Sequence, residues 1–412
     1  MVSLVSLLVL GLTVSPLSDH IVRRSPLAHA QAAFEKGTGR VAFLGGSITE
    51  MPGWRVKVMD DLQKRFPKTR FSFACAGLSS TCSDTGAYRL EEDVYRQGVP
   101  DLIFVEYAVN DSGDGYYRKG RHDPSTYAVH TLRGVEGVIR HIRSRDSRTD
   151  IVMTHFVDGS HLPDLRAGRL PSTYAIDERV ARHYDVTTVS IGAALVAAER
   201  NGTFDWKRYG ANCHPNEAGC RFAFEQYQKL FDAEWPTGRP ASPAAQPKAL
   251  PAAIDPLCYA AGRYFDLRKV VCADDGWKIG PVDWSNQPGV CRGNYRAGDL
   301  LVSDQVGATC SFEFSGTAVG AFVLAGPDSG SLEVSIDGAA FKVYEMFSPY
   351  SKGPMGLHYP FVETFADTLK DGFHRVVLRV GRARNESSTG NWVRIYRLCV
   401  NGDLPRRRST CN

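Results

Sequence analysis

Four short segments of the sequence carry residues that could do chemistry together. The first is Gly-Gly-Ser-Ile-Thr at 45–49, which follows the apolar run Val41–Leu44 directly. A serine between small residues at a strand-to-helix turn can present its hydroxyl as a nucleophile, with its own backbone N–H facing the same point. The same loop is equally compatible with Ser47 as a plain helix N-cap, preceded by glycines that make the turn.

Two further segments each follow an apolar run and could bind a substrate oxygen. Gly77 follows the run Phe71–Ala74, and Asn110 lies in the segment 106–111 that follows the run Leu102–Val105. A glycine offers an unshielded N–H, and the side-chain amide of an asparagine can donate to a developing oxyanion. Taken singly, Gly77 could simply make a turn, and an asparagine such as Asn110 is more often a turn or cap residue.

The fourth segment supplies a candidate general base. His214 stands on a loop-like stretch, and Pro215 and Asn216 open a predicted helix behind it. A histidine held in this way can accept a proton from a nucleophile. The histidines and aspartates show no ligand spacing typical of a metal site, so we predict neither a metal nor another cofactor.

These four segments must be positioned by a parallel sheet. Helix-like stretches such as Trp54–Phe66 and Tyr127–Arg145 separate the apolar runs, with apolar residues recurring at helical spacing. Strands alternating with helices predict an α/β domain whose five-stranded parallel sheet is covered on both faces. The active site of such a domain lies beyond the carboxyl ends of its strands. The five predicted strands are Val41–Leu44, Phe71–Ala74, Leu102–Val105, Ile151–Thr154 and Thr187–Ile191.

Taken together, the segments resemble the four blocks of the SGNH (GDSL-like) hydrolases. Those blocks contribute Ser, Gly, Asn and His in that order, and here they supply Ser47, Gly77, Asn110 and His214. The resemblance covers about residues 26–234, and the strings SSTCSDTGAYRLEEDV and PDLIFVEYAVND resemble a two-domain, carbohydrate-esterase-like subgroup.

The resemblance implies a flavodoxin-like three-layer α/β/α domain and a serine esterase mechanism. Ser47 would be the nucleophile and His214 its base. The oxyanion hole would be formed by the N–H groups of Ser47 and Gly77 and by the Asn110 amide. Arg89 lies in the same motifs, where it could contact substrate or pair with the acidic residues at 91–93; we favour the structural role.

The sequence departs from the family at the residue expected to orient the base. The family has an aspartate three residues before the catalytic histidine, and that position is Ala211 here. Either the backbone carbonyl of Ala211 orients the ring, or a carboxylate from elsewhere does so, or catalysis is impaired. We favour the carbonyl, because a histidine needs only an acceptor at its far nitrogen to fix its tautomer.

The cysteines and the N-terminus indicate an exported protein. The chain has ten cysteines, and an even number on loop-like sequence favours disulfides. The predicted pairs are Cys75–Cys82 and Cys213–Cys220, each bracketing a short loop. The apolar stretch Leu4–Val14 has the length of a signal-peptide core and is too short to span a bilayer. We therefore predict a signal peptide at 1–20 and a secreted, extracellular or cell-envelope protein.

Composition divides the remainder of the chain. The catalytic domain is predicted at 21–234, and a Pro/Ala-rich linker at 235–256 follows it. Short alternating stretches then predict an all-β jelly-roll or sandwich domain at 257–412. That domain resembles accessory modules of polysaccharide esterases. Its aromatic residues could bind sugar or fill the core, and the candidates are Trp284, Tyr350 and Trp392.

The leading hypothesis is a secreted carboxylic ester hydrolase that removes O-acetyl groups from a polysaccharide. The net charge of +4 is small for 412 residues, and the sequence has no basic stripe typical of nucleic-acid binding. No segment is predicted to span a membrane. One alternative is an arylesterase or lipase-like hydrolase of small esters. Another is a non-catalytic carbohydrate-binding or adhesion protein on the same scaffold. Ala211 favours this alternative, because it replaces the aspartate that orients the catalytic histidine in the family. The glycan, the acyl group and the oligomeric state are left open.

Overall fold

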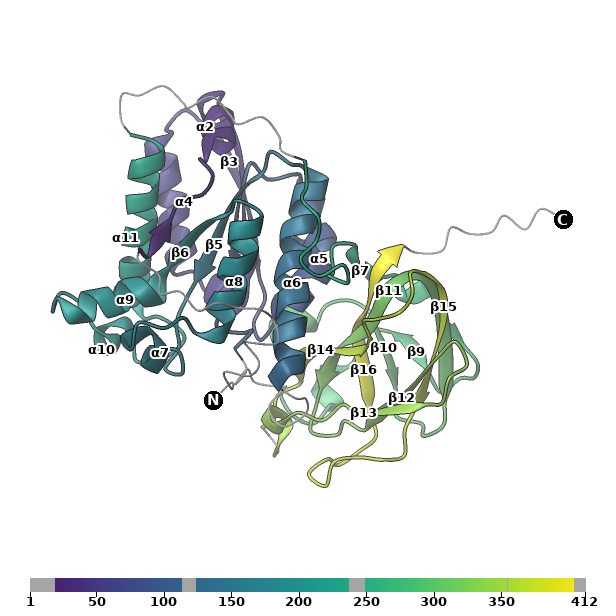
Figure 1. Ribbon diagram of the computed structural model, residues 1–412. Coiled ribbons are helices and arrows are strands. Elements are labelled where there is room, and N and C mark those ends of the chain that lie inside the picture. Colours follow the sequence, from purple (N-terminus) through teal and green to yellow (C-terminus); the bar gives the residue numbers. More distant parts are fainter. Residues whose placement is uncertain (1–18, 113–123, 237–248, 354, 404–412) are drawn as a thin grey trace. The chain divides into compact units, whose positions relative to one another are not determined.

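A computed structural model describes residues 19–112, 124–236, 249–353 and 355–403 (Figure 1). The chain forms two compact units, Met1–Ala260 and Ala261–Asn412. The predicted signal peptide lies outside the described residues except for residues 19–20, as do residues 237–248 of the predicted linker. Within the described parts of the chain, no helix combines the length and the apolar character needed to cross a membrane.

The first unit is built on a six-stranded sheet with the order β1-β6-β5-β4-β2-β3. Strands β2 to β6 are all parallel, which confirms the predicted five-stranded parallel sheet. The sixth strand, β1, pairs antiparallel with β6 at the sheet edge. With only two residues it has no hydrophobic pattern that could have predicted it. The strands are β1 (Ile21–Val22), β2 (Thr38–Gly45), β3 (Arg70–Gly77), β4 (Leu102–Glu106), β5 (Asp150–His155) and β6 (Thr187–Ser190).

Helices cover both faces of this sheet, as Figure 1 shows. Helices α5, α6 and α8 pack side by side on one face, and α4 and α11 pack together on the other. The helices are α2 (Ala28–Glu35), α3 (Ser47–Glu50), α4 (Trp54–Arg65), α5 (Ser83–Asp93), α6 (Pro124–Arg145), α7 (Leu162–Arg166), α8 (Ser172–His183), α9 (Ile191–Arg200), α10 (Trp206–Tyr209) and α11 (Glu217–Glu234).

Strand order places a crevice where the predicted site residues stand. The parallel strands run β3-β2-β4-β5-β6 across the sheet, so the chain winds one way from β2 to β3 and the other way from β4 onward. The switch point of such a sheet lies between its first and third parallel strands, here β2 and β4, beyond their carboxyl ends. Ser47 follows β2 and Asn110 follows β4.

Residues 249–260, which include the end of the predicted linker, are anchored on α6. The Glu136 carboxylate accepts hydrogen bonds from the backbone N–H groups of Ile254 (2.5 Å) and Asp255 (2.8 Å). Arg133 donates to the Asp255 carboxylate over 2.8 Å. These contacts make the segment part of the first unit, which extends to Ala260.

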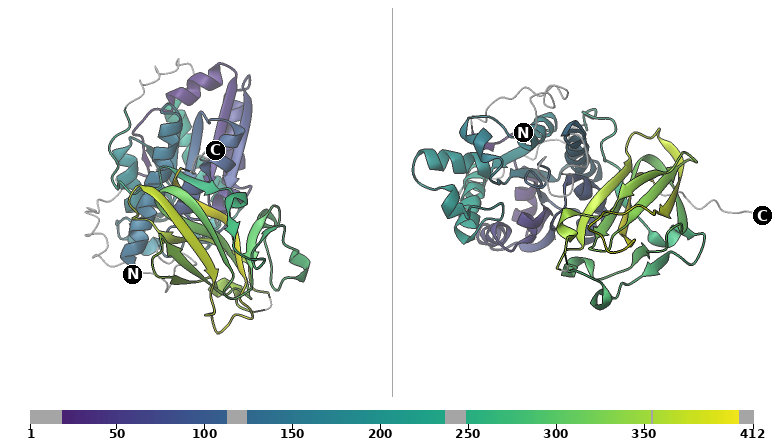
Figure 2. Two further views of the ribbon diagram at one scale, coloured as in Figure 1. Left: turned by 90° about the vertical axis from the view of Figure 1, so that its right-hand side faces the viewer. Right: turned by 90° about the horizontal axis from the view of Figure 1, so that it is seen from below.

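The second unit consists of antiparallel strands, as predicted for an all-β domain (Figure 2). Strand β11 is its longest, and it pairs with β15 along Thr309–Gly316 and with β14 along Val319–Ala325. A strand that changes partner midway lets one antiparallel sheet fold over into a sandwich. The strands are β7 (Gly262–Phe265), β8 (Val271–Cys272), β9 (Lys278–Gly280), β10 (Leu300–Ser303), β11 (Thr309–Ala325), β12 (Ser331–Ile336), β13 (Lys342–Glu345), β14 (Tyr359–Ala366), β15 (Gly372–Val380) and β16 (Val393–Asp403).

Candidate active site

Ser47 is the first residue of α3, a helix of only four residues that follows β2 directly. So short a helix needs outside partners for its carbonyl groups. Trp54 Nε1 donates to the Ile48 carbonyl over 3.1 Å, and Arg55 Nε donates to the Thr49 carbonyl over 2.8 Å. Since Trp54 is fully buried and stacks on Tyr227 with ring centroids 5.1 Å apart, these bonds attach the serine-bearing turn to the core.

His214 lies on the loop between α10 and α11, and its Nε2 stands 2.8 Å from Ser47 Oγ. The loop is fixed from behind by Asn216, whose side chain accepts from Gly219 N (2.9 Å) and whose backbone N–H donates to the Tyr209 carbonyl (3.0 Å). The structure therefore brings together a predicted nucleophile and base that are separated by 167 positions in the chain.

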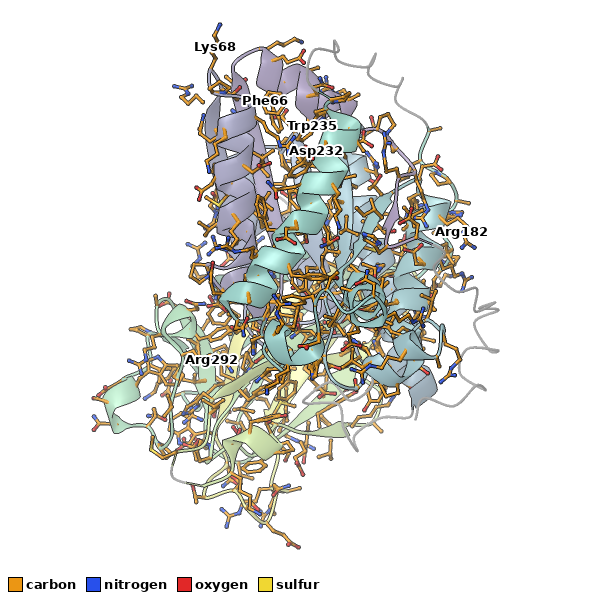
Figure 3. The ribbon with its side chains drawn as sticks, turned by 90° about the vertical axis from the view of Figure 1, so that its left-hand side faces the viewer. Phe66, Lys68, Arg182, Asp232, Trp235 and Arg292 are labelled. Atoms are coloured by element: carbon orange, nitrogen blue, oxygen red, sulfur yellow. The ribbon has the colours of Figure 1, made fainter. Side chains whose placement is uncertain are left out.

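The Ser47 turn and the His214 loop meet because helices α4 and α11, which follow them, are held together at both ends. At their N-terminal ends, Lys57 Nζ lies 2.6 Å from a Glu217 carboxylate oxygen. At their C-terminal ends, the rings of Phe66 and Trp235 pack edge to face with centroids 5.4 Å apart (Figure 3). The two helices thus run side by side in the same direction, and the loops that precede them carry Ser47 and His214.

Gly77 and Asn110, the predicted oxyanion donors, border the same turn. A methyl group on Gly77 would come within 2.2 Å of the Glu50 nitrogen, so only glycine lets β3 approach the backbone of α3 this closely. A methyl group on Gly46 would lie 2.4 Å from Asn110 Oδ1, which places the Asn110 side chain against the residue before Ser47. Asn110 itself is buried.

Arg89 is buried behind these loops, with 1% of its surface exposed. Its Nη2 donates to the carbonyls of Gly45 (2.9 Å) and Ala76 (2.6 Å), and to the Tyr107 hydroxyl (3.0 Å). Its Nη1 donates to Asp93 over 2.7 Å. The guanidinium therefore joins the ends of β2 and β3.

Glu106 is a buried carboxyl that the sequence analysis did not single out. It ends β4, is fully buried, and accepts a hydrogen bond from Thr49 Oγ1 over 2.9 Å. Burial raises its pKa to about 8, although hydrogen bonds from Thr49 and the Gly46 N–H oppose the shift. At neutral pH it is thus an uncharged group that ties α3 to β4. The sequence feature that could have revealed Glu106 is its position as the one charged residue at the end of an otherwise apolar strand.

The ring nitrogen of His214 that faces away from Ser47 has a sulfur neighbour. Cys213 Sγ lies 3.5 Å from His214 Nδ1. Ala211, whose carbonyl we predicted as the acceptor, adopts a left-handed conformation with φ of 49°. Its backbone N–H donates to the Trp206 carbonyl over 2.9 Å. The role of the Ala211 carbonyl stays a prediction.

The two predicted disulfides are not present in the structure, because Cys75 and Cys220 are both thiols. Cys75 is exposed and accepts from Arg55 Nη1 over 3.1 Å, whereas its predicted partner Cys82 directs its sulfur to the Asn110 carbonyl over 3.2 Å. Cys220 is buried, and its sulfur points to the Pro215 carbonyl over 3.6 Å. Short spacing in the chain did not bring either pair of sulfurs together.

Comparison with known proteins places the site in a family context. Residues 43–222 match the model of the GDSL-like lipase/acylhydrolase family. Two crystal structures of a two-domain esterase active on acetylated mannans, one co-crystallised with mannopentaose, are similar to both units. They are 17% and 18% identical to this chain with a TM-score of 0.70, and cover 94% of it and 98% of their own chains.

A further solved structure is similar to part of the chain. It is the acetylxylan esterase Axe2 from Geobacillus stearothermophilus, which is 19% identical, covers 49% of this chain and 97% of its own, and has a TM-score of 0.40. No curated protein matches the sequence significantly.

Replacing Arg89 with lysine should lower kcat rather than raise KM. The single ammonium group of lysine cannot reach the Gly45 and Ala76 carbonyls and Asp93 together. Each buried acceptor that loses its hydrogen-bond donor costs about 1–3 kcal/mol of stability. We expect a kcat loss of roughly tenfold, which corresponds to about 1.4 kcal/mol of transition-state stabilisation, and a lower melting temperature. Asp93→Asn, at the more exposed end of the same pair, is the control and should change both far less. A raised KM with kcat intact would instead indicate that Arg89 touches substrate.

Glu106 should make stability depend on pH. Its folded-state pKa lies above its ordinary value of 4.5, so its stabilising contribution is complete below about pH 4.5 and is lost as pH rises towards 8. We expect the free energy of unfolding of the wild type to fall relative to Glu106→Gln over this window, by about 1.4 kcal/mol for each unit of pKa shift. Denaturant titrations of both proteins at several pH values measure the difference. The exposed Glu35→Gln is the charge-matched control, and parallel curves for Glu106→Gln and wild type would contradict the assignment.

Proposed function

We propose that this chain is a carboxylic ester hydrolase that removes O-acetyl groups from a polysaccharide through a Ser47–His214 acyl-enzyme mechanism. The match of residues 43–222 to the GDSL-like lipase/acylhydrolase model supports the ester chemistry. The observation that carries the proposal is the 2.8 Å contact between His214 Nε2 and Ser47 Oγ. This is the distance at which a general base can take the proton of a nucleophile.

The proposed reaction uses the groups gathered at the carboxyl ends of β2, β3 and β4. Ser47 Oγ attacks the acetyl carbonyl carbon while His214 Nε2 takes the hydroxyl proton. The N–H groups of Ser47 and Gly77 and the Asn110 amide stabilise the oxyanion, and each such donor is worth about 3–4 kcal/mol.

Three further proton transfers by His214 complete the cycle. The tetrahedral intermediate collapses, and the sugar oxygen leaves with the proton from His214, so that the acetyl group remains on Ser47. Water then attacks this ester as His214 takes its proton, and the proton returns to Ser47 Oγ when acetate departs.

The polysaccharide as substrate is supported by the two-unit architecture. The solved esterase with the same architecture is active on acetylated mannans, and we infer an O-acetylated glycan here. In the second unit, Tyr350 is 42% exposed and stacks on Tyr359 with centroids 4.8 Å apart. Trp284 and Trp392 are half-buried, against His358 and beneath Arg394 respectively.

We further infer that the protein is secreted, because its substrate would be a polysaccharide outside the cell and its first residues have the composition of a signal peptide. N-terminal sequencing of the protein recovered from the culture medium of its source tests this. A new N-terminus near residue 20 would support export, and retention of Met1 in the cell fraction would contradict it.

The mechanism is tested by hydrolysis of an aryl acetate by wild type, Ser47→Ala and His214→Ala, together with acetate release from acetylated mannan and acetylated xylan. We expect kcat to fall at least about 10³-fold in each variant, because a nucleophile and its base act as one unit. The double variant should be no worse than either single variant.

The control is Ser285→Ala, an exposed serine of the second unit, which should retain full activity. Unchanged hydrolysis by Ser47→Ala would overturn the mechanism. Full activity on the aryl acetate without acetate release from any glycan would overturn the polysaccharide as substrate.

A further inference from the structure

The base His214 ends a hydrogen-bonded row formed by three consecutive residues, with Cys213 at its centre. Cys213 Sγ lies 3.5 Å from His214 Nδ1 on one side and 3.1 Å from Asn212 Oδ1 on the other. The thiol donates to Asn212 Oδ1, which also accepts the His214 backbone N–H over 3.3 Å. Asn212 thus fixes the direction of the Cys213 S–H bond.

This direction determines what the sulfur offers to the imidazole. A thiol can donate one hydrogen bond and accept another. Since the S–H of Cys213 is directed at Asn212, its lone pairs face His214 Nδ1. A sulfur lone pair that faces Nδ1 favours the histidine tautomer with its proton on Nδ1. In that tautomer Nε2 is unprotonated, and its own lone pair faces the Ser47 hydroxyl.

We propose that Cys213 is a positioning residue that sets the tautomer and orientation of His214. It would do through sulfur what an aspartate three residues before the histidine does in the SGNH hydrolases, where this chain has Ala211. The inference rests on the proposed Ser47–His214 mechanism. Cys213 does not touch the reacting atoms, and it acts on the imidazole alone.

The sulfur also faces the imidazole when His214 becomes positively charged in the transition state. A neutral thiol stabilises this charge through its dipole only, so its contribution is smaller than that of a carboxylate. Loss of Cys213 should therefore cost less than the roughly 10⁴-fold fall in kcat that a wrong tautomer causes in serine proteases.

The test compares Cys213→Ala, Cys213→Val and Cys213→Ser on the aryl acetate. Alanine and valine both remove the acceptor, alanine with a smaller side chain than cysteine and valine with a larger one. We expect both to lower kcat by roughly 10- to 100-fold, within the bound of a wrong tautomer, with KM unchanged. Serine accepts and donates as the thiol does, so Cys213→Ser should stay within about threefold of wild type. Cys272→Ala, at a partly exposed cysteine of the second unit, is the control and should be unaffected.

A spectroscopic measurement covers the case of a variant that folds poorly. The ¹⁵N shifts of His214 in labelled wild type, referenced against His214→Gln, report which ring nitrogen carries the proton. The proposal requires the proton of the neutral ring on Nδ1, and a proton on Nε2 would overturn it.

The outcomes separate this inference from the proposed function. If Ser47→Ala abolishes hydrolysis but Cys213→Ala and Cys213→Val retain wild-type kcat, the inference alone fails, and the Ala211 carbonyl becomes the acceptor to test. If Ser47→Ala leaves hydrolysis unchanged, the proposed function itself fails. Equal losses in Cys213→Ala, Cys213→Val and Cys213→Ser would also overturn the inference, because they would show that a hydrogen-bonding side chain at this position does not preserve kcat.

Discussion

The 2.8 Å contact between Ser47 Oγ and His214 Nε2 sets the precision that the first unit must maintain. A displacement of about 1 Å between reacting groups can cost about 10²-fold in rate. Ser47 stands on a helix of only four residues and His214 on a loop, so neither position is secured by its own segment. The precision comes from α4 and α11, which are joined by Lys57 and Glu217 at one end and by Phe66 and Trp235 at the other.

The opposite side of the serine is secured by buried polar groups rather than by apolar packing. Arg89 holds the last carbonyls of β2 and β3, and Glu106 holds Thr49 from the end of β4. Their charges matter as much as their bonds. Because burial keeps Glu106 protonated near neutral pH, it supplies acceptors to the serine turn without placing a negative charge beside a developing oxyanion. An ionised carboxylate there would oppose the charge that the donors are meant to stabilise.

The regular elements of the first unit could be predicted from the sequence, because a strand buried on both faces must be almost wholly apolar. The run Leu102–Val105 is an example, and it lies within the observed β4. The four chemically relevant residues could be found because each stands where such a run ends or a helix opens. Ser47 and His214 are brought together as the order of the blocks implied. Glu106 was overlooked, since a pattern of apolar residues does not say whether the charged residue at its end is buried.

The cysteines show where reasoning from spacing is insufficient. Residues seven apart can form a disulfide only if the backbone between them turns their sulfurs together. In the helix that starts at Glu217, the Cys220 sulfur points to the Pro215 carbonyl. Cys220 instead fills the space that Gly53 leaves open, where an added methyl group would lie 2.5 Å from its sulfur. Cys213 is thereby left beside the imidazole.

Cys213 cannot both form a disulfide with Cys220 and remain a thiol beside His214. A bond between Cys213 and Cys220 would remove the S–H that Asn212 orients, and it would draw the Cys213 sulfur towards α11. The loop would gain a covalent closure and lose the acceptor at His214 Nδ1. With Cys213 in its proposed role, the orientation of the base depends on this residue remaining a thiol.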